Sequence, residues 1–461
     1  MTTKNSSIYL FCLLLLSGCA AHQPIKQTTI THHYPQQRQS QSHQHSTSAH
    51  QPAQTHTPVI IQQTTTITPI TKPQTPSTQT QASQVQAPTN HNYGNFADWK
   101  ADFSRRAINA GYNRYAVQQL INSAQLNQQV LSLDSGQPEF AKMPWEYVDS
   151  AVSGGRVNRG KNKFAEQRSL LSRLETQYGV NADIIAGIWG MESSYGAVTG
   201  NSDLPSALSS LAYDGRRRSF AESQLLAMLQ LIQRGDISPY DLKGSWAGGM
   251  GQTQFIPATW LEQGVDGDGD GHRNPWSTAD ALSSTANYLR NSGWVRGLEP
   301  FYEVQLPSNF DYTLIGTKMP FSQWRNLGVI PLTSTYMDAN TPLELWLPAG
   351  QDGPALLLSK NFDVIKVYNN SSNYALGVSL LAKAISGQGG LQKAWPRYEQ
   401  PLSTYQVKTL QQRLTNAGYD TRGVDGIIGT NTRKAFARWQ ANNGQIPDGF
   451  ISKRSAGSLI W

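Results

Sequence analysis

The sequence predicts a mainly α-helical protein with a small partly β insertion and a separate, compact helical unit at its C-terminal end. Apolar residues recur at helical spacing through most of residues 93–396 and again through 402–461. Short strand-like runs gather between residues 300 and 367. Residues 20–92 contain mainly Gln, Thr, Ser, His and Pro and cannot bury enough apolar surface to fold. We therefore expect a disordered linker ahead of the folded part.

Residues 1–19 have the layout of an export signal. Lys4 precedes an apolar run over residues 8–16 that is too short to span a bilayer comfortably. The Leu-Ser-Gly-Cys sequence that ends at Cys19 is similar to a bacterial lipobox, in which the cysteine is acylated. This resemblance implies a lipid anchor at Cys19, and Ala20 favours sorting to the outer membrane, with the protein facing the periplasm. A secretory signal with an incidental cysteine is the alternative.

Residue counts narrow the chemistry of the folded part. Cys12 and Cys19 are the only cysteines, so no disulfide, thiol nucleophile or thiolate ligand remains after the signal segment. His272 is the only histidine after residue 91, whereas a zinc hydrolase usually needs at least two. We therefore expect carboxylates to carry the proton transfers, without an organic cofactor. The formal charge of +7 suits an anionic envelope polymer better than nucleic acid, because no nucleic-acid motif is present.

A single carboxylate, Glu192, ends an otherwise apolar helix whose predicted N-cap is Asn181. It lies in the segment Gly-Ile-Trp-Gly-Met-Glu-Ser-Ser-Tyr-Gly, residues 187–196. A glutamate in that position would be partly desolvated, which favours its neutral form. A neutral carboxyl group can protonate a leaving group, the general-acid role in glycoside cleavage. An ordinary solvated glutamate at a helix end is the alternative.

Residues 244–260 form a second motif, in which glycines alternate with Trp, Met, Phe and Ile. Glycine lets a backbone approach a partner closely, and the interleaved apolar residues favour a packed cleft wall over a surface loop. Ser245 and Gln254 would then be candidate sugar contacts. Further helices are predicted at 96–110, 220–233, 281–291 and 374–385, and one more ends near Gly179. Residues 143–147 are predicted to form an aromatic loop or the start of a helix.

The third motif, residues 266–272, alternates aspartate with glycine and ends at His272. Carboxylates at alternate positions of such a loop can converge on a hard cation such as calcium. Ser277 stands where a calcium loop of the EF-hand type would carry a bidentate glutamate, so the pattern is incomplete. A solvated acidic turn without metal is the alternative.

Together the three motifs resemble those of the B-type lytic murein transglycosylases, over about residues 95–396. The resemblance implies a lysozyme-like catalytic domain that cleaves the β-1,4 bond between N-acetylmuramic acid and N-acetylglucosamine in peptidoglycan. Cleavage leaves a 1,6-anhydromuramic end, and Glu192 acts first as acid and then as base. The resemblance also implies sugar contacts from Tyr147, Ser245, Gln254, Tyr288, Tyr368 and Asn369. Its calcium ligands map onto Asp266, Asp268, Asp270, the main-chain carbonyl of His272, and Asp280.

The insertion and the C-terminal unit complete the prediction. We expect strands at 343–347, 355–358 and 364–367, in an insertion that flanks the cleft. Residues 396–401 read as a linker, and Thr430 as the cap of the second helix of the unit that follows. The sequence Asp-Gly-Phe-Ile at 448–451 echoes Asp-Gly-Ile-Ile at 425–428. This unit resembles the small three-helix peptidoglycan-binding module.

Two other functions stay open at this point. A hydrolytic muramidase would need a second carboxylate to activate water, and Asp203, Asp214 and Asp241 are the candidates for that role. A non-catalytic scaffold that only binds the wall would not need Glu192.

Overall fold

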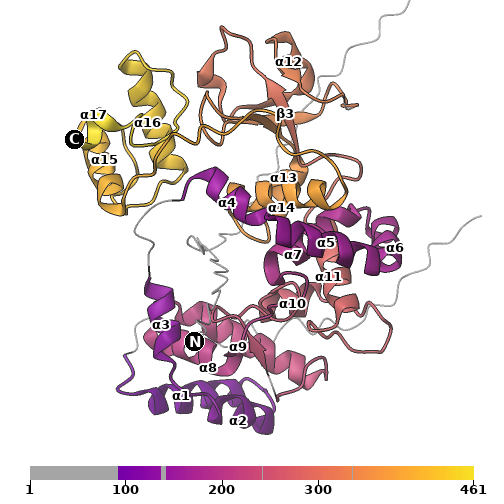
Figure 1. Cartoon of the computed structure of the whole chain (residues 1–461). Helices are drawn as coiled ribbons and strands as arrows, with labels where there is room; N and C mark the ends of the chain where they lie inside the picture. Colours follow the sequence, from indigo (N-terminus) through magenta and orange to yellow (C-terminus); the bar gives the residue numbers. More distant parts are fainter. Residues whose placement is uncertain (1–91, 137–141, 241, 335) are drawn as a thin grey trace, which may run out of the picture. The chain divides into compact units, whose positions relative to one another are not determined.

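A computed structural model describes residues 92–136, 142–240, 242–334 and 336–461 (Figure 1). The predicted signal segment, its Cys19, nearly all of the linker and Asp241 lie outside these ranges. Within them no helix is both long and apolar enough to cross a bilayer.

The described chain is mainly helical, as predicted. Its helices are α1 (Phe96–Asn109), α2 (Arg114–Asn122), α3 (Gln128–Ser135), α4 (Pro144–Ala151), α5 (Gly154–Glu166), α6 (Arg168–Tyr178), α7 (Ala182–Ser193), α8 (Leu204–Asp214), α9 (Arg218–Gln233), α10 (Pro257–Gln263), α11 (Thr278–Asn291), α12 (Phe321–Asn326), α13 (Lys360–Ile365), α14 (Ser372–Ile385), α15 (Thr404–Asn416), α16 (Thr430–Asn442), α17 (Gly457–Ile460) and the 3-10 turn η2 (Tyr312–Leu314).

Two apolar clusters form the helical core. One surrounds α7 and α14, where Ile185, Ile188 and Leu381 are fully or almost fully buried. The other joins α1, α2, α8 and α9 and contains Trp99 and Leu225. Because α7 carries apolar residues on all its faces, it packs in the interior rather than on the surface. Its C-terminal end is therefore held rigidly, and that end carries Glu192.

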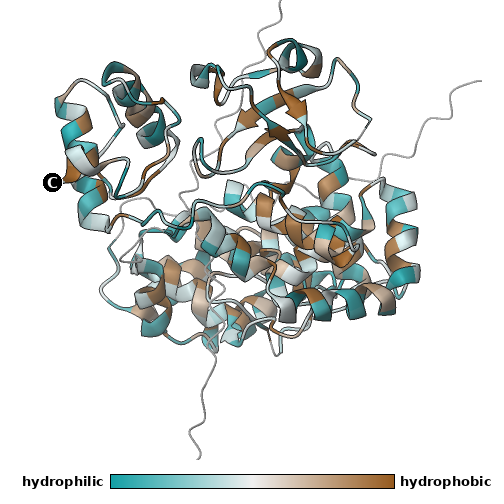
Figure 2. Cartoon of the chain, turned by 45° about the horizontal axis from the view of Figure 1, so that its top comes forward, coloured by the Kyte–Doolittle hydropathy of each residue, from teal (hydrophilic) through white to brown (hydrophobic). Residues whose placement is uncertain are grey.

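The insertion is a five-stranded antiparallel sheet of order β4-β6-β7-β3-β5, which we call the sheet insertion (residues 301–358). Its register pairs Phe301 with Leu358 and Leu345 with Leu357. Apolar residues colour much of this sheet brown in Figure 2, and β7 is buried along its whole length. The strands are β3 (Phe301–Gln305), β4 (Lys318–Pro320), β5 (Ile330–Pro331), β6 (Pro342–Trp346) and β7 (Ala355–Leu358); β1 (Ser202–Asp203) and β2 (Lys243–Gly244) pair separately.

Two local predictions are wrong. Residues 364–367 do not form a strand, because α13 runs through residue 365 and a turn follows at 366–367. Its N-cap Ser359 accepts the Asn361 N–H through its hydroxyl, and Phe362 and Ile365, three residues apart, are both buried. The second helix of the C-terminal unit is capped by the extended Gly429, so Thr430 is its first residue and not its cap.

The C-terminal unit consists of α15, α16 and α17 around its own apolar cluster, which includes Phe436. A separate small cluster joins this unit to the first domain. In it the ring of Phe450 lies 6.5 Å from that of Trp145 on α4, and Trp145 lies 6.2 Å from Trp395. The unit is therefore packed against the first domain through aromatic side chains.

Candidate active site

Glu192 lies in the last turn of α7 and is only 9% exposed. Asn181 occupies the predicted N-cap position, although its side chain makes no capping hydrogen bond. Burial raises the pKa of Glu192 to about 7, because desolvation penalises the carboxylate. The hydroxyl of Tyr374 on α14 donates a hydrogen bond of 2.6 Å to Oε1 of Glu192, which partly offsets that rise. A carboxyl group with this pKa can both give up and accept a proton near neutral pH.

The turn after Glu192 has an unusual backbone. Ser194, Tyr195 and Gly196 follow one another with φ of 52°, 63° and 80°. Residues other than glycine rarely adopt this left-handed region of the backbone. Ser193 holds the turn, since its hydroxyl accepts the Gly196 N–H at 2.8 Å and donates to the carbonyl of Gln252. This strained turn ends α7 immediately beyond Glu192.

Tyr195 anchors the same turn in the core. Its buried ring packs edge-on against Trp189, and its hydroxyl lies where α5 and α7 approach each other at Gly160 and Gly190. A Cβ at either glycine would overlap the tyrosine ring. The two glycines therefore form a slot that fits the side chain of Tyr195.

Residues 244–256 fold into a compact glycine-rich segment beside α7. Bridges pair Gly244 with Met250 and Met250 with Phe255. The hydroxyl of Ser245 accepts the Gly249 N–H at 2.8 Å. Gln254 adopts a φ of 52°, and its Nε2 donates to the carbonyls of Thr199 and Gly251 at 2.9 and 2.7 Å. The two predicted sugar contacts, Ser245 and Gln254, are thus fixed by backbone groups.

Gln252 links this segment to α7 and α11. Its Oε1 accepts the indole N–H of Trp189 at 2.8 Å, and its Nε2 donates to the Thr278 hydroxyl at 2.8 Å. The sequence analysis predicts a role for Gln254, two residues further on, and assigns none to Gln252. The sequence shows two glutamines two positions apart, and nothing in it indicates which one connects the elements.

The predicted aromatic contacts Tyr288 and Tyr368 lie together against Phe255. The ring of Phe255 is 5.2 Å from that of Tyr368 and 5.6 Å from that of Tyr288, and the two tyrosine rings are 5.6 Å apart. The hydroxyls of Tyr368 and Thr285 share a hydrogen bond of 2.8 Å. Burial raises the pKa of Tyr368 well above its usual value, and the charge of Glu192 adds to that rise, so this cluster is electrostatically coupled to the carboxyl group.

The other two predicted contacts lie on either side of α14. Tyr147, on α4, is half-buried and packs against the cluster around α7 and α14, where a Cβ at Gly377 would meet its ring at 3.2 Å. Burial and the charge of Glu192 raise the pKa of Tyr374, and Tyr147 contributes to the same rise, which places Tyr147 in the electrostatic environment of Glu192. Asn369 follows Tyr368 in the turn ahead of α14, and its carbonyl accepts the Ser371 N–H.

The acidic loop brings three of its predicted ligands together. Carboxylate oxygens of Asp266, Asp268 and Asp280 all lie within 4.8 Å of one another. Asp280 is fully buried and accepts the N–H groups of Gly267 and Asn274 at 2.8 and 2.7 Å. Asp270 lies outside this group and accepts the His272 N–H at 2.8 Å. Oxygen ligands of this kind fit a hard cation such as calcium.

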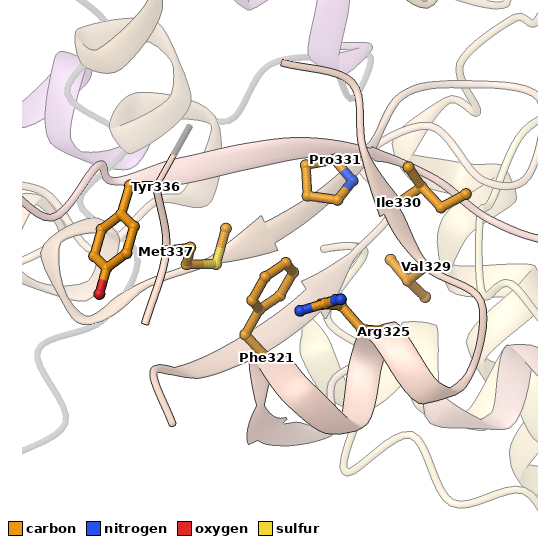
Figure 3. A pocket seen from close by; sticks show the side chains of 7 residues that line it. All are labelled: Phe321, Arg325, Val329, Ile330, Pro331, Tyr336 and Met337. Atoms are coloured by element: carbon orange, nitrogen blue, oxygen red, sulfur yellow. The ribbon is translucent and has the colours of Figure 1, made fainter. Parts of the chain in front are cut away.

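A shallow pocket of about 490 Å³ lies elsewhere, on the sheet insertion. Figure 3 shows Phe321 and Arg325 on α12 and the side chain of Tyr336 at its margin. None of the predicted site residues lines this pocket.

Comparisons with known proteins agree on the family. Residues 95–383 match the family model described as transglycosylase SLT domain, and residues 403–454 match a peptidoglycan binding domain. The membrane-bound lytic murein transglycosylase B of Escherichia coli (strain K12) is 30% identical over 302 residues, which are 60% of this chain and 79% of that protein.

Two solved structures show the same similarity. The crystal structure of SltB3 from Pseudomonas aeruginosa in complex with NAG-anhNAM-pentapeptide has a TM-score of 0.77 and 41% identity. That match covers 80% of this chain and 100% of SltB3. Slt35 from Escherichia coli, in complex with calcium, has a TM-score of 0.55 and 28% identity over 67% of this chain and 97% of its own. The chain therefore belongs to the transglycosylase SLT family and is a peptidoglycan lytic transglycosylase, a lyase that acts on the glycan strands of murein.

Proposed function

We propose that Glu192 is the catalytic acid and base of this lytic transglycosylase. The carboxyl proton of Glu192 passes to the glycosidic oxygen as the bond from C1 of N-acetylmuramic acid breaks. The N-acetyl group of the same sugar stabilises the positive charge that develops at C1. The Glu192 carboxylate then removes the proton of the C6 hydroxyl, whose oxygen attacks C1 and closes the 1,6-anhydro ring. The carboxylic acid is regenerated, and no water is consumed.

One observation carries this proposal: the buried Glu192 has a pKa of about 7 and a hydroxyl donor at 2.6 Å. The first step needs the acid and the second needs the carboxylate, so a pKa near neutral serves both. Tyr374 stabilises the carboxylate between the two steps, because a hydrogen bond to the charged form favours that form.

The remaining predicted contacts orient the sugars in this proposal. The hydroxyl of Ser245 accepts a backbone N–H and keeps its own proton for a sugar oxygen. The amide nitrogen of Gln254 donates to two carbonyls, so the orientation of the amide is fixed and Oε1 can accept a hydrogen bond from a sugar hydroxyl. The rings of Tyr288 and Tyr368 provide an apolar wall, and Tyr147 and Asn369 contact the sugars from beside α14.

A hydrolytic muramidase is the alternative function. It would require a second carboxylate to activate water. Asp203 instead caps α8 by accepting the Ser206 N–H at 2.9 Å, and Asp214 lies 3.5 Å from Arg216. Both carboxylates have structural partners, which favours a single acid and base. A scaffold that only binds the wall would not need a carboxyl group raised to a neutral pKa.

We further propose that the acidic loop binds a structural calcium ion. Asp266, Asp268 and Asp280 converge, and the relative Slt35 was solved in complex with calcium. Asp270 and the main-chain carbonyl of His272 complete the ligand set. The cation would reduce the repulsion among three neighbouring carboxylates and fix the start of α11, the helix that carries Tyr288.

The N-terminal segment is proposed to carry a lipid anchor. Acylation at Cys19 would tether the enzyme to the outer membrane and place it in the cell envelope, facing the periplasm. A relative named as membrane-bound supports this location. Globomycin-sensitive processing and labelling by a palmitate analogue would test it, with Cys19→Ala as the unlabelled control.

Product analysis on purified sacculi tests the catalytic proposal. Wild type is expected to release muropeptides with 1,6-anhydro ends, which mass spectrometry separates from hydrated, reducing ends. Glu192→Gln is expected to lower this release by at least about 10³-fold, because proton transfer contributes to both steps. Robust release by the variant, or reducing ends from wild type, would contradict the assignment.

A further inference from the structure

The C-terminal unit contains the same turn twice. In the first copy Gln411, on α15, accepts the Gly426 N–H at 2.8 Å and donates to Oδ1 of Asp425 at 2.8 Å. In the second copy Gln440, on α16, accepts the Gly449 N–H at 2.8 Å. It also donates to Oδ1 of Asp448 at 3.1 Å. Each aspartate Oδ1 also accepts the N–H two residues further along, so each turn follows the same hydrogen-bond pattern.

The second copy is occupied by another part of the chain. The second carboxylate oxygen of Asp448, Oδ2, takes no part in the turn and accepts the Gln351 N–H at 3.0 Å. The preceding residue, Gly350, has a φ of +69°, and an L side chain there would lie 2.5 Å from that oxygen. Phe450, two residues after Asp448, is 6% exposed and covers Trp145. This turn therefore recognises a residue without an L side chain, followed by an amide N–H.

The first copy presents the same groups, and its Asp425 is exposed, with the side chains of Thr404 and Lys408 beside Gly426. The carboxylate of Asp425 accepts from Gln411 and from N–H groups of its own turn, and among the described residues no main-chain N–H from another segment occupies it as Gln351 occupies Asp448. Ile427, at the position equivalent to Phe450, is 49% exposed. The neighbouring helix residue also differs, since Lys408 lies beside Gly426 where Ala437 lies beside Gly449. The open copy thus carries an exposed cation that interacts with its own Asp425 and that an acidic partner can also reach, whereas the second copy has Ala437 at this position.

Stereochemistry identifies the class of partner. A φ near +70° is unfavourable for L-residues and, by mirror symmetry, favourable for D-residues. The side chain of a D-residue also occupies the position of the other Cα hydrogen, away from the aspartate. The peptide stems of peptidoglycan combine D-residues, amide N–H groups and carboxylates. They supply each feature that the open turn would recognise.

We propose that Asp425, Ile427 and Lys408 form a binding site for the D-residue-containing peptide stem of peptidoglycan. Oδ2 of Asp425 accepts the amide N–H that follows a D-residue, Ile427 packs against its side chain, and Lys408 pairs with a stem carboxylate. The proposal rests on peptidoglycan being the polymer that this enzyme binds. It assigns the peptide to the C-terminal unit and the sugars to the site around Glu192.

Titration of the full chain with a labelled stem pentapeptide ending in D-Ala-D-Ala tests the proposal. Asp425→Asn keeps Oδ1, which caps the turn, and replaces the free acceptor by an amide donor. We expect it to weaken binding about tenfold or more, as loss of a charged hydrogen bond does. The matched variant Asp448→Asn, in the occupied copy, should leave the peptide affinity within twofold of wild type.

Two further comparisons keep the test independent of folding defects. Lys408→Ala, on an exposed helix face, should lower the affinity at low salt and lose its effect at high salt. The same pentapeptide with L-Ala-L-Ala should bind at least about tenfold more weakly.

Equal binding by Asp425→Asn, equal binding of the L-diastereomer, or preference for glycan strands stripped of peptides would each overturn the proposal. Release of anhydro-muropeptides by wild type, measured in parallel, reports separately on the catalytic function.

Discussion

The hydroxyl of Tyr374 lies 2.6 Å from Oε1 of Glu192, although the two residues are 182 positions apart in the chain. Tyr374 belongs to α14 and Glu192 to α7, and these two helices pack side by side in one apolar cluster. Burial pushes the carboxyl group toward its neutral form, and the hydrogen bond from Tyr374 acts in the opposite direction. The balance between them sets the pKa on which both proposed proton transfers depend.

Removing the Tyr374 hydroxyl should raise the pKa of Glu192 further. Tyr374→Phe is expected to shift the alkaline limb of the kcat/KM profile upward by about one unit, because the lost hydrogen bond favoured the carboxylate. It should also lower kcat about tenfold, since the carboxylate is the base of the second step. Tyr302→Phe, at a buried tyrosine of the sheet insertion, is the control. Superimposable profiles for wild type and Tyr374→Phe would refute this role.

The wild-type enzyme should need Glu192 protonated at the start of the reaction. With a pKa of about 7, kcat/KM is expected to be flat on the acid side and to fall about tenfold per unit above pH 7. Initial rates of anhydro-muropeptide release between pH 5 and 9 measure this. An alkaline limb centred near 4.5, the ordinary value for glutamate, would show that burial does not tune the group.

Glu192→Gln should stabilise the protein at alkaline pH. The folded pKa is raised above the unfolded value of 4.5, so the folded state holds the extra proton. That contribution to stability is complete below pH 4.5 and is lost as the pH rises to about 7, which amounts to about 3 kcal/mol. A neutral glutamine does not suffer this loss. Denaturant unfolding at pH 5 and pH 8 should show a gain only at pH 8, and a gain independent of pH would argue against a buried titrating carboxyl group.

Much of this architecture follows from the sequence, because it depends on local patterns. Helices with a clear apolar period, such as α1 and α6, end within about a residue of their predicted limits, and β7 coincides with the predicted strand. The strand predicted at 364–367 is wrong, because a short apolar run suits a strand or a buried helix equally well. Only the Ser359 cap and the packing of Phe362 select the helix.

The candidate site contains residues that short sequence motifs indicate and others that only the fold brings into place. Glu192, Ser245 and the acidic loop lie within short motifs and could be found from them. Tyr374 and Gln252 could not, because their roles depend on contacts between segments far apart in the chain. In the sequence Tyr374 is one more apolar residue at the start of a helix. The direction of its hydroxyl is decided by how α14 packs on α7.

Calcium should stabilise the folded protein through the acidic loop. We expect the Tm in excess calcium to exceed that in EDTA by several degrees, because the ion binds the folded state and relieves the repulsion among three adjacent carboxylates. Asp268→Asn, at an exposed ligand, should abolish most of this difference. Glu166→Gln, at an exposed ion pair on α5, is the control and should retain the full difference. An equal calcium response in Asp268→Asn would show that the ion binds elsewhere.

The glycine slot around Tyr195 should tolerate no side chain. Gly190→Ala places a methyl group against the Tyr195 ring and is expected to cost about 1–3 kcal/mol or more. Gly155→Ala, in α5, has open space around it and should instead stabilise that helix by up to about 1 kcal/mol. Urea unfolding of the two variants makes the comparison. A neutral Gly190→Ala would mean that the turn after Glu192 can shift without cost.

The contact between α7 and α14 has a consequence for the order in which the enzyme becomes active during synthesis. A nascent chain that has not yet extended to residue 374 contains Glu192 but lacks the hydroxyl that tunes it and much of the apolar cluster that buries it. Its carboxyl group would titrate like that of an ordinary solvated glutamate. The proposed proton donor is therefore completed by one of the last helices of the domain to be made, and a product truncated before residue 374 would lack the tuned carboxyl group.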